Sequence, residues 1–252
     1  MKISRFSTIA LMITLFIHAD ITLAEWRPSD TEMSRLPAYC KARFAEGSPE
    51  FASWRNTLGQ DFIHVHHYCA GLNFINRSFG ITSKNDREGT LIAAVREIDY
   101  VLKHSSPSFS LIPEMYMYRG IANSLMKRDT DAFSDASKAV EKNPRLAKAY
   151  HLLADHYERI QEKSRALEIV IIGLQHNPSS KSLQKRYLEL GGKLPYPEPI
   201  QQATPNKGTA PTEEEKPKVD ESTRPPVKAT EEPPPQTNIG SPSNPYCRFC
   251  TD

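Results

Sequence analysis

One pattern of aromatic, small and proline residues occurs twice in this chain, 34 residues apart and without a gap. The aligned pairs are Tyr116 with Tyr150, Gly120 with Ala154, Ala132 with Ala166, Ala139 with Gly173, and Pro144 with Pro178. The two units span residues 113–146 and 147–180. A fixed period of this length is typical of repeat proteins, in which each unit needs a neighbour to bury its apolar face. The sequence therefore predicts stacked copies of one small structural unit.

Each unit has the pattern of two helices joined by a short turn. Apolar residues recur at three- and four-residue intervals over residues 114–126 and 147–160, as amphipathic helices require. A short polar turn follows, and an Asn-Pro pair ends the second helix, because proline lacks a backbone donor and restricts the residue before it. The small residues at the aligned positions would let two helices approach closely. We expect each unit to be an antiparallel helical hairpin.

Weaker helical patterns flank these two units. A third unit over residues 61–107 has His67 at its aromatic position and a second helix over about 87–104. After the repeats, residues 180–191 predict a helix that is apolar on one side and charged on the other, as a terminal cap needs for solubility. Residues 25–60 predict an N-terminal helical cap. Residues 61–193 would then form the repeat domain.

The spacing of the aligned positions resembles the tetratricopeptide repeat, whose pattern is W-x2-L-G-x2-Y, then A-x3-F, then P. The chain departs from this pattern at several positions. Tyrosine replaces both tryptophans, Arg119 and Asn123 stand at the leucine and tyrosine positions of the first unit, and Ala136 and Val170 stand at the phenylalanine position. The resemblance implies an all-α fold, a right-handed stack of antiparallel helical hairpins (a TPR-like α-solenoid) with a concave groove.

In the tetratricopeptide family the first helix of each pair lines the groove, and the groove binds a protein or peptide partner. The residues that the resemblance places there are Met117, Ile121, Lys148, His151, Asp155 and Arg159. Apolar side chains beside mixed charges suit a peptide or a partner helix. The same six side chains also suit an ordinary exposed helix surface, and that alternative stays open.

Three histidines and a cysteine lie close together at His64, His66, His67 and Cys69, which raises a metal or thiol-redox protein as a second hypothesis. At about 100° per residue, His64 and His67 share one side of a continuous helix, and His66 and Cys69 share the other. The four groups would not converge on one ion, so a metal site would need ligands from elsewhere. We expect His67 to be hydrogen-bonded within the first hairpin, and His66 and Cys69 to face the N-terminal segment.

The N-terminal end of the chain indicates an oxidising compartment. Residues 1–24 have a positive start, an apolar centre and a small-residue exit, which is typical of a cleaved secretory signal peptide, with an uncleaved anchor as the alternative. In the periplasm or outside the cell, Cys40 and Cys69 are natural disulfide partners. Cys247 and Cys250 would form a local C-x-x-C disulfide, would belong to a short aromatic element that docks on another protein, or would form intermolecular disulfides.

The remaining sequence narrows the class of function. Residues 194–244 are rich in Pro, Glu, Lys and Thr and predict a disordered linker before the C-x-x-C tail of residues 245–252. No basic stripe accompanies the net charge of +2, which argues against nucleic acid, and no further apolar span predicts membrane insertion. No catalytic motif or cofactor motif is found. We interpret the chain as a non-enzymatic, secreted or periplasmic scaffold of bacterial type that binds a protein or peptide, such as part of an envelope assembly complex.

Overall fold

A computed structural model describes residues 26–200 of the chain. The predicted signal peptide, most of the predicted linker and the tail with Cys247 and Cys250 lie outside the described residues. Residues 26–200 are all-helical and contain no strand, which confirms the predicted fold class in its coarse form. The elements are α1 (Asp30–Met33), α2 (Ala38–Arg43), α3 (Pro49–Leu58), the 3-10 helix η1 (Gln60–His64), α4 (Val65–Ser78), α5 (Lys84–His104), α6 (Ile112–Leu125), α7 (Asp129–Lys142), α8 (Ala147–Arg159), α9 (Lys163–His176) and α10 (Lys181–Glu189).

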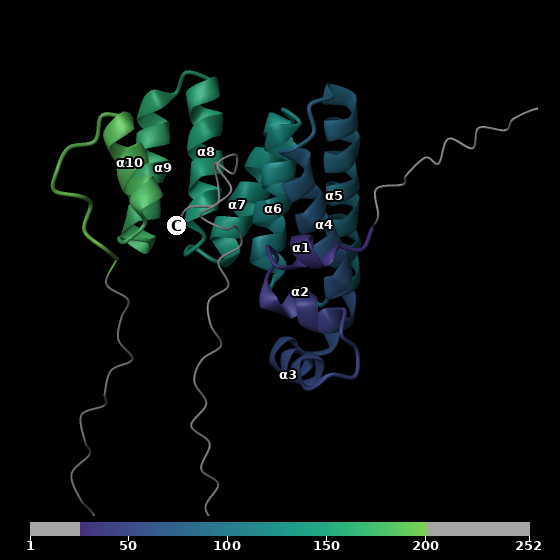
Figure 1. The fold of residues 1–252 in the computed structure, drawn as a ribbon. Coiled ribbons are helices and arrows are strands. Elements are labelled where there is room, and N and C mark those ends of the chain that lie inside the picture. The colour runs from purple at the N-terminus through teal and green to yellow at the C-terminus, as the bar shows by residue number, and fades with distance from the viewer. Residues whose placement is uncertain (1–25, 201–252) are drawn as a thin grey trace, which may run out of the picture.

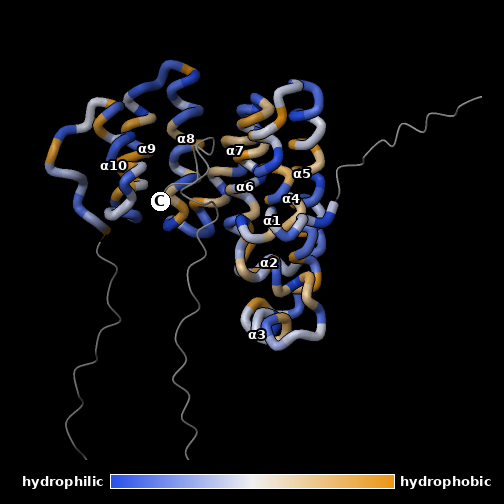
Figure 2. The backbone as a smooth tube through the Cα atoms, in the orientation of Figure 1, coloured by the Kyte–Doolittle hydropathy of each residue, from blue (hydrophilic) through white to orange (hydrophobic). Residues whose placement is uncertain are grey.

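The helices pack as consecutive pairs. α4 packs on α5, α6 on α7 and α8 on α9, and α10 then packs on α9. Figure 1 shows these helices side by side, from α4 and α5 at one edge of the molecule to α9 and α10 at the other. None of the helices within residues 26–200 is long and apolar enough to cross a membrane, and Figure 2 shows hydrophilic residues interspersed along them.

The two 34-residue units share the bounds of their second helix and the backbone geometry of their turn. The bounds of α7 and α9 differ by 34 residues at both ends. The turn inside each unit contains one residue with a positive φ, Lys127 at 60° and Gln161 at 63°. One residue after each of these, a backbone amide donates to the carbonyl five residues before it, at 2.9 and 2.8 Å. The predicted repeat is therefore present in the backbone as well as in the sequence.

Small residues allow the paired helices to approach closely, as predicted. A Cβ atom placed on Gly71 of α4 would lie 2.8 Å from Ile98 Cγ1 of α5. A Cβ atom placed on Gly173 of α9 would lie 2.9 Å from Tyr150 Cγ of α8. Real Cβ atoms do not approach other atoms this closely, so the packing of both pairs depends on glycine at these positions.

We expect Gly173→Ala to lower the free energy of unfolding by about 1–3 kcal/mol, because the added methyl group overpacks the α8–α9 contact. Gly89→Ala is the matched control, since Gly89 lies in α5 and a Cβ atom there would meet no atom within 4 Å. The control should raise the free energy of unfolding by about 0.5–1 kcal/mol, because alanine restricts the unfolded helix segment. Urea unfolding followed by circular dichroism measures both, and effects of the same sign would contradict the packing argument.

Two hydrophobic clusters form the core of the described part of the chain. The larger cluster joins α2, α4, α5 and α6 and extends to α8, and the smaller one joins α8, α9 and α10. Leu183, Tyr187 and Leu190 belong to the smaller cluster, as predicted for the capping helix. The Tyr196 ring lies 5.9 Å from the Tyr187 ring, and the Ile200 amide donates to the carbonyl oxygen of Gln175 at 3.0 Å. Contacts with the helices thus continue past residue 193, where the sequence predicted the linker to begin.

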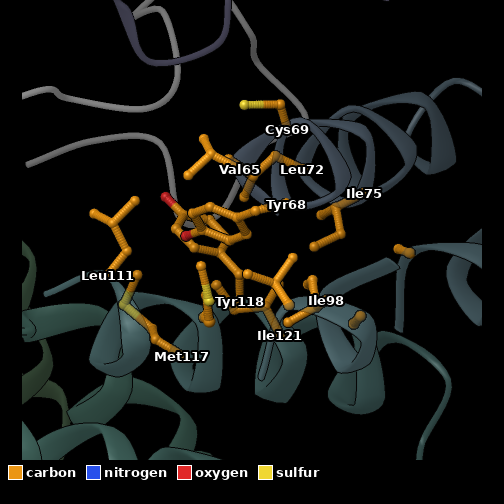
Figure 3. Close-up of a cluster of buried hydrophobic side chains, with 14 of the residues drawn as sticks. Val65, Tyr68, Cys69, Leu72, Ile75, Ile98, Leu111, Met117, Tyr118 and Ile121 are labelled. Carbon is orange, nitrogen blue, oxygen red and sulfur yellow. The ribbon is translucent and has the colours of Figure 1, made fainter. Parts of the chain in front are cut away.

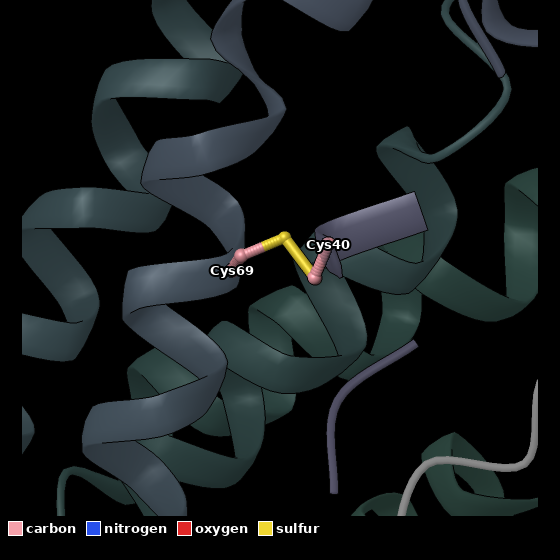
Figure 4. Close-up of a disulfide and its surroundings, with 2 residues drawn as sticks. All are labelled: Cys40 and Cys69. Carbon is pink, nitrogen blue, oxygen red and sulfur yellow. A yellow bond between two sulfur atoms is a disulfide. The ribbon is translucent and has the colours of Figure 1, made fainter. Parts of the chain in front are cut away.

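The N-terminal cap is joined covalently to the first helix pair. Cys40 of α2 and Cys69 of α4 form a disulfide with their Cα atoms 5.6 Å apart, which confirms the predicted pairing. Figure 4 shows this bond between the two helices. Arg77 of α4 also holds α1, because its Nε and Nη2 atoms donate to the two carboxylate oxygens of Glu32 at 2.5 and 2.9 Å.

Candidate functional site

Two of the six predicted groove residues lie inside the protein. Met117 and Ile121 are only 4% and 2% exposed. Figure 3 shows both among side chains packed between α4, α5 and α6. This part of the prediction is wrong, because the first helix pair covers the side of α6 that the repeat pattern assigns to a groove. Neither side chain can contact a partner in this fold.

The other four predicted groove residues lie on α8, and each contacts a neighbouring helix. The contacts are Lys148 Nζ to the Tyr118 ring centre at 5.8 Å, His151 Nε2 to Ser182 Oγ at 2.9 Å, Asp155 Oδ1 to Arg186 Nη2 at 2.5 Å, and Arg159 Nη2 to Asp129 Oδ1 at 3.0 Å. These contacts connect α8 to α6, α10 and α7. Binding of a partner by these four residues stays a prediction.

A polar recess of about 280 Å³ lies where α5, α6 and α7 meet. Arg119 and Asn123 of α6 and Asp135 of α7 form its floor, since they are the least exposed of its polar residues. The walls are formed by two residues of α5 and by residues at the start and along one face of α7. These wall residues are Val95, Asp99, Arg128, Asp131, Ser134 and Lys138.

The floor of the recess is a hydrogen-bonded ion pair. Arg119 donates to both carboxylate oxygens of Asp135, from Nε at 2.9 Å and from Nη2 at 2.5 Å. Asn123 Nδ2 donates to the same carboxylate at 3.2 Å, and Arg119 Nη1 donates to Asp99 at the rim. Burial disfavours the charged form of Arg119, but hydrogen bonds and charges from Asp135 and Asp99 outweigh it and raise its pKa. The guanidinium therefore stays charged although its side chain is only 20% exposed.

The second repeat unit has apolar side chains where the first has this network. Thirty-four residues after Arg119, Asn123 and Asp135 stand Leu153, Tyr157 and Ile169, and all three pack against the hydrophobic clusters. Apolar side chains of similar volume are often as stabilising as a buried ion pair, or more so. The hairpin fold therefore does not require the charges, and we take the recess as the candidate functional site.

Sequence reasoning found only part of this site. Arg119 and Asn123 are visible in the sequence as departures from the repeat pattern, but the pattern does not assign them to a site. Asp135 gave no signal, because it does not stand at a position that the pattern specifies. Nothing in the spacing showed that Asp99, from the preceding hairpin, would reach the same guanidinium.

The segment that contains His64, His66 and His67 forms its contacts outside the recess. His67 Nδ1 lies 2.6 Å from Glu97 Oε2, which confirms that His67 is hydrogen-bonded within the first hairpin. His66 contacts the ring of Trp26 in the N-terminal segment, at 5.4 Å between ring centres. His64 ends η1 and does not belong to α4, and its ring lies 6.0 Å from that of His104. Residues 26–200 contain no group of three or more His, Cys, Asp or Glu placed to hold one metal ion.

Acid should destabilise the fold through His66. Burial, together with the charge of Arg43, lowers its pKa from 6.5 to about 4. The unfolded chain then binds a proton that the folded chain does not, so stability should fall as the pH drops from about 6.5 towards 4. Urea unfolding at pH 7 and pH 5 should show this loss, and His66→Gln should reduce the difference between the two values. An unchanged difference would show that other groups cause the pH dependence.

A control variant separates the pH dependence caused by His66 from the pH dependence caused by carboxylates. The ion pair with Arg77 lowers the pKa of Glu32 from 4.5 to about 2, so its contribution is lost only as the pH falls through that lower range. Glu32→Gln should therefore lower stability at pH 7 and at pH 5 by similar amounts. A change confined to pH 5 would contradict this assignment.

Comparison with known proteins adds no family to this picture. No family model matches the chain, and no curated protein matches it well enough to serve as a relative.

Proposed function

We propose that this protein is a secreted or periplasmic helical-repeat protein of the tetratricopeptide type, which binds a protein or peptide partner. The observation that carries the proposal is the recurrence of one helical hairpin after 34 residues: the second helix of each pair has equivalent bounds, and a residue with positive φ stands at the equivalent position of each turn. Stacked hairpins of this kind present extended surfaces, and binding is their general use. The proposed architecture is a right-handed stack with α10 as its cap.

Two further observations support the proposed compartment. The Cys40–Cys69 disulfide is of a kind that persists in oxidising environments and is rare in the cytosol. Residues 1–24 have the sequence pattern of a secretory signal peptide, for which we propose cleavage after Ala24. Sequencing the N-terminus of the protein recovered from the envelope or the medium tests this directly, because the mature chain should begin at Glu25.

The polar recess is the surface that we propose for partner contact. Its wall residues on α7 are exposed, its floor is hydrogen-bonded, and the second unit has no charged side chain at the positions equivalent to Arg119 and Asp135 of that floor. A preorganised polar floor with an exposed rim suits specific binding of a partner. A wrong partner would leave polar groups of the recess without matching groups of its own, and this lowers its affinity.

Photo-crosslinking in the source cells tests this proposal. A benzophenone amino acid would replace Ser134, which is exposed in the recess. In a control variant it would replace Glu168, the exposed residue of α9 that stands 34 residues later. We expect an adduct with one defined second protein from position 134 and none from position 168. The same adducts from both positions, or no intermolecular adduct from either, would contradict the proposal.

A further inference from the structure

The charges along one face of α7 follow a definite order. Arg128, the residue before α7, and Asp131, Asp135 and Lys138 of α7 all line the recess and stand at positions i, i+3, i+7 and i+10. At a rise of about 1.5 Å per residue, the two cations lie about 15 Å apart along the helix axis, with both carboxylates between them. The recess thus has basic ends and carboxylates in the middle.

The middle of the recess carries an excess of negative charge. Arg119 is shared between two carboxylates, those of Asp135 and Asp99, so this group of three has a net charge of −1. Asp131 adds a second negative charge on the α7 wall. Asp99 is 48% exposed, so part of this charge faces solvent. The complementary ligand is a chain segment with basic residues in its middle and acidic residues at its ends.

The chain itself contains a segment of this kind in its C-terminal tail (residues 201–252). Residues 215–220 read "EKPKVD", so Lys216 and Lys218 lie between Glu215 and Asp220. An extended or polyproline-like segment rises about 3.1 to 3.3 Å per residue, which separates Glu215 from Asp220 by about 16 Å. This matches the separation of Arg128 and Lys138 along the helix axis. Two lysines would then lie over the carboxylates in the middle of the recess.

We propose that residues 215–220 occupy the recess in cis and compete there with the partner. The tail begins after Ile200, which is held at the end of α9 by its hydrogen bond to Gln175. Glu215 lies 15 positions after Ile200, enough for a reach of about 50 Å when extended, against a radius of gyration of about 16 Å for a domain of this size. A tether of this kind gives an effective concentration in the millimolar range, so weak ion pairs suffice for occupancy. The competition, but not the occupancy, rests on the proposed function.

The test uses the purified full-length mature chain at low concentration. With the benzophenone at Ser134, we expect an intramolecular crosslink to residues 213–221, located by mass spectrometry and insensitive to protein dilution. The crosslink should weaken at high salt, because exposed ion pairs are screened. The benzophenone at Glu168 is the matched control. Lys216→Glu with Lys218→Glu should reduce the yield to the level of this control, and adding Asp131→Lys should restore part of it.

The outcomes separate this inference from the proposed function. No crosslink to residues 213–221, or a yield that the lysine substitutions leave unchanged, would overturn the inference even if a partner is captured in cells. A crosslink whose yield rises with protein concentration would also overturn it, since a second copy would then supply the segment. If the tail crosslinks but no partner adduct forms in cells, the occupancy stands and the proposed function fails. If both stand, the lysine variant should give more partner adduct than the native chain.

Discussion

Arg119→Leu should lower the free energy of unfolding by about 3–5 kcal/mol, one of the two largest effects that we expect in this protein. The reason is not the loss of attraction alone. Asp135 is only 4% exposed, and without the guanidinium it would retain one hydrogen bond, from Asn123. An uncompensated buried carboxylate carries a large desolvation penalty. Urea unfolding of the full-length chain, followed by circular dichroism, measures the effect.

The second repeat unit supplies the control for this prediction. Arg119→Leu, Asn123→Tyr and Asp135→Ile together install the three side chains that the second unit carries at the equivalent positions. Because no charge is then left buried, this triple variant should recover most of the stability that the single variant loses. It should also abolish the crosslinks from Ser134. A triple variant less stable than Arg119→Leu would show that the charges are needed for the fold and would remove the main argument for a site.

Where sequence reasoning succeeded, local chemistry determined the structure. The Asn-Pro pairs end α7 and α9, and the small residues at the aligned positions lie in the contacts between paired helices. These features depend on residues within one hairpin, so periodicity and spacing reveal them. The bounds of the first hairpin were predicted less accurately. Ser83 caps α5, which begins at Lys84, three residues before the predicted start of that helix.

Where sequence reasoning failed, the deciding contacts came from another hairpin. The repeat pattern places Met117 and Ile121 in a groove, but both are buried in the cluster that joins α6 to the helices of the first pair. The recess depends on Asp99 of α5 meeting Arg119 of α6, two helices whose relative position no spacing rule determines. Departures from a repeat pattern indicate where contacts between hairpins should be sought. They do not identify the residues on the other helices that form those contacts.

The other large effect concerns the bond between the N-terminal cap and α4. Cys40→Ser with Cys69→Ser should lower the free energy of unfolding by about 3–4 kcal/mol, because the bond closes a loop with a sequence separation of 29 residues. For a domain of this size that corresponds to a melting temperature about 10 °C lower. Thermal unfolding of the full-length chain, with and without a reducing agent, measures it.

In this double variant, structure should be lost first in the N-terminal cap and not in the repeats. Tyr39 and Tyr68 directly precede the two cysteines, are 2% and 0% exposed, and have nearly parallel rings 6.5 Å apart, so this bond holds a buried aromatic contact in place. Near-ultraviolet circular dichroism should therefore change before helix content does. Cys247→Ser with Cys250→Ser is the matched control and should leave the melting temperature unchanged, while the native chain and this control should lose equal stability on reduction. If neither reduction nor the Cys40–Cys69 double substitution changed the melting temperature, packing alone would hold α2 on α4.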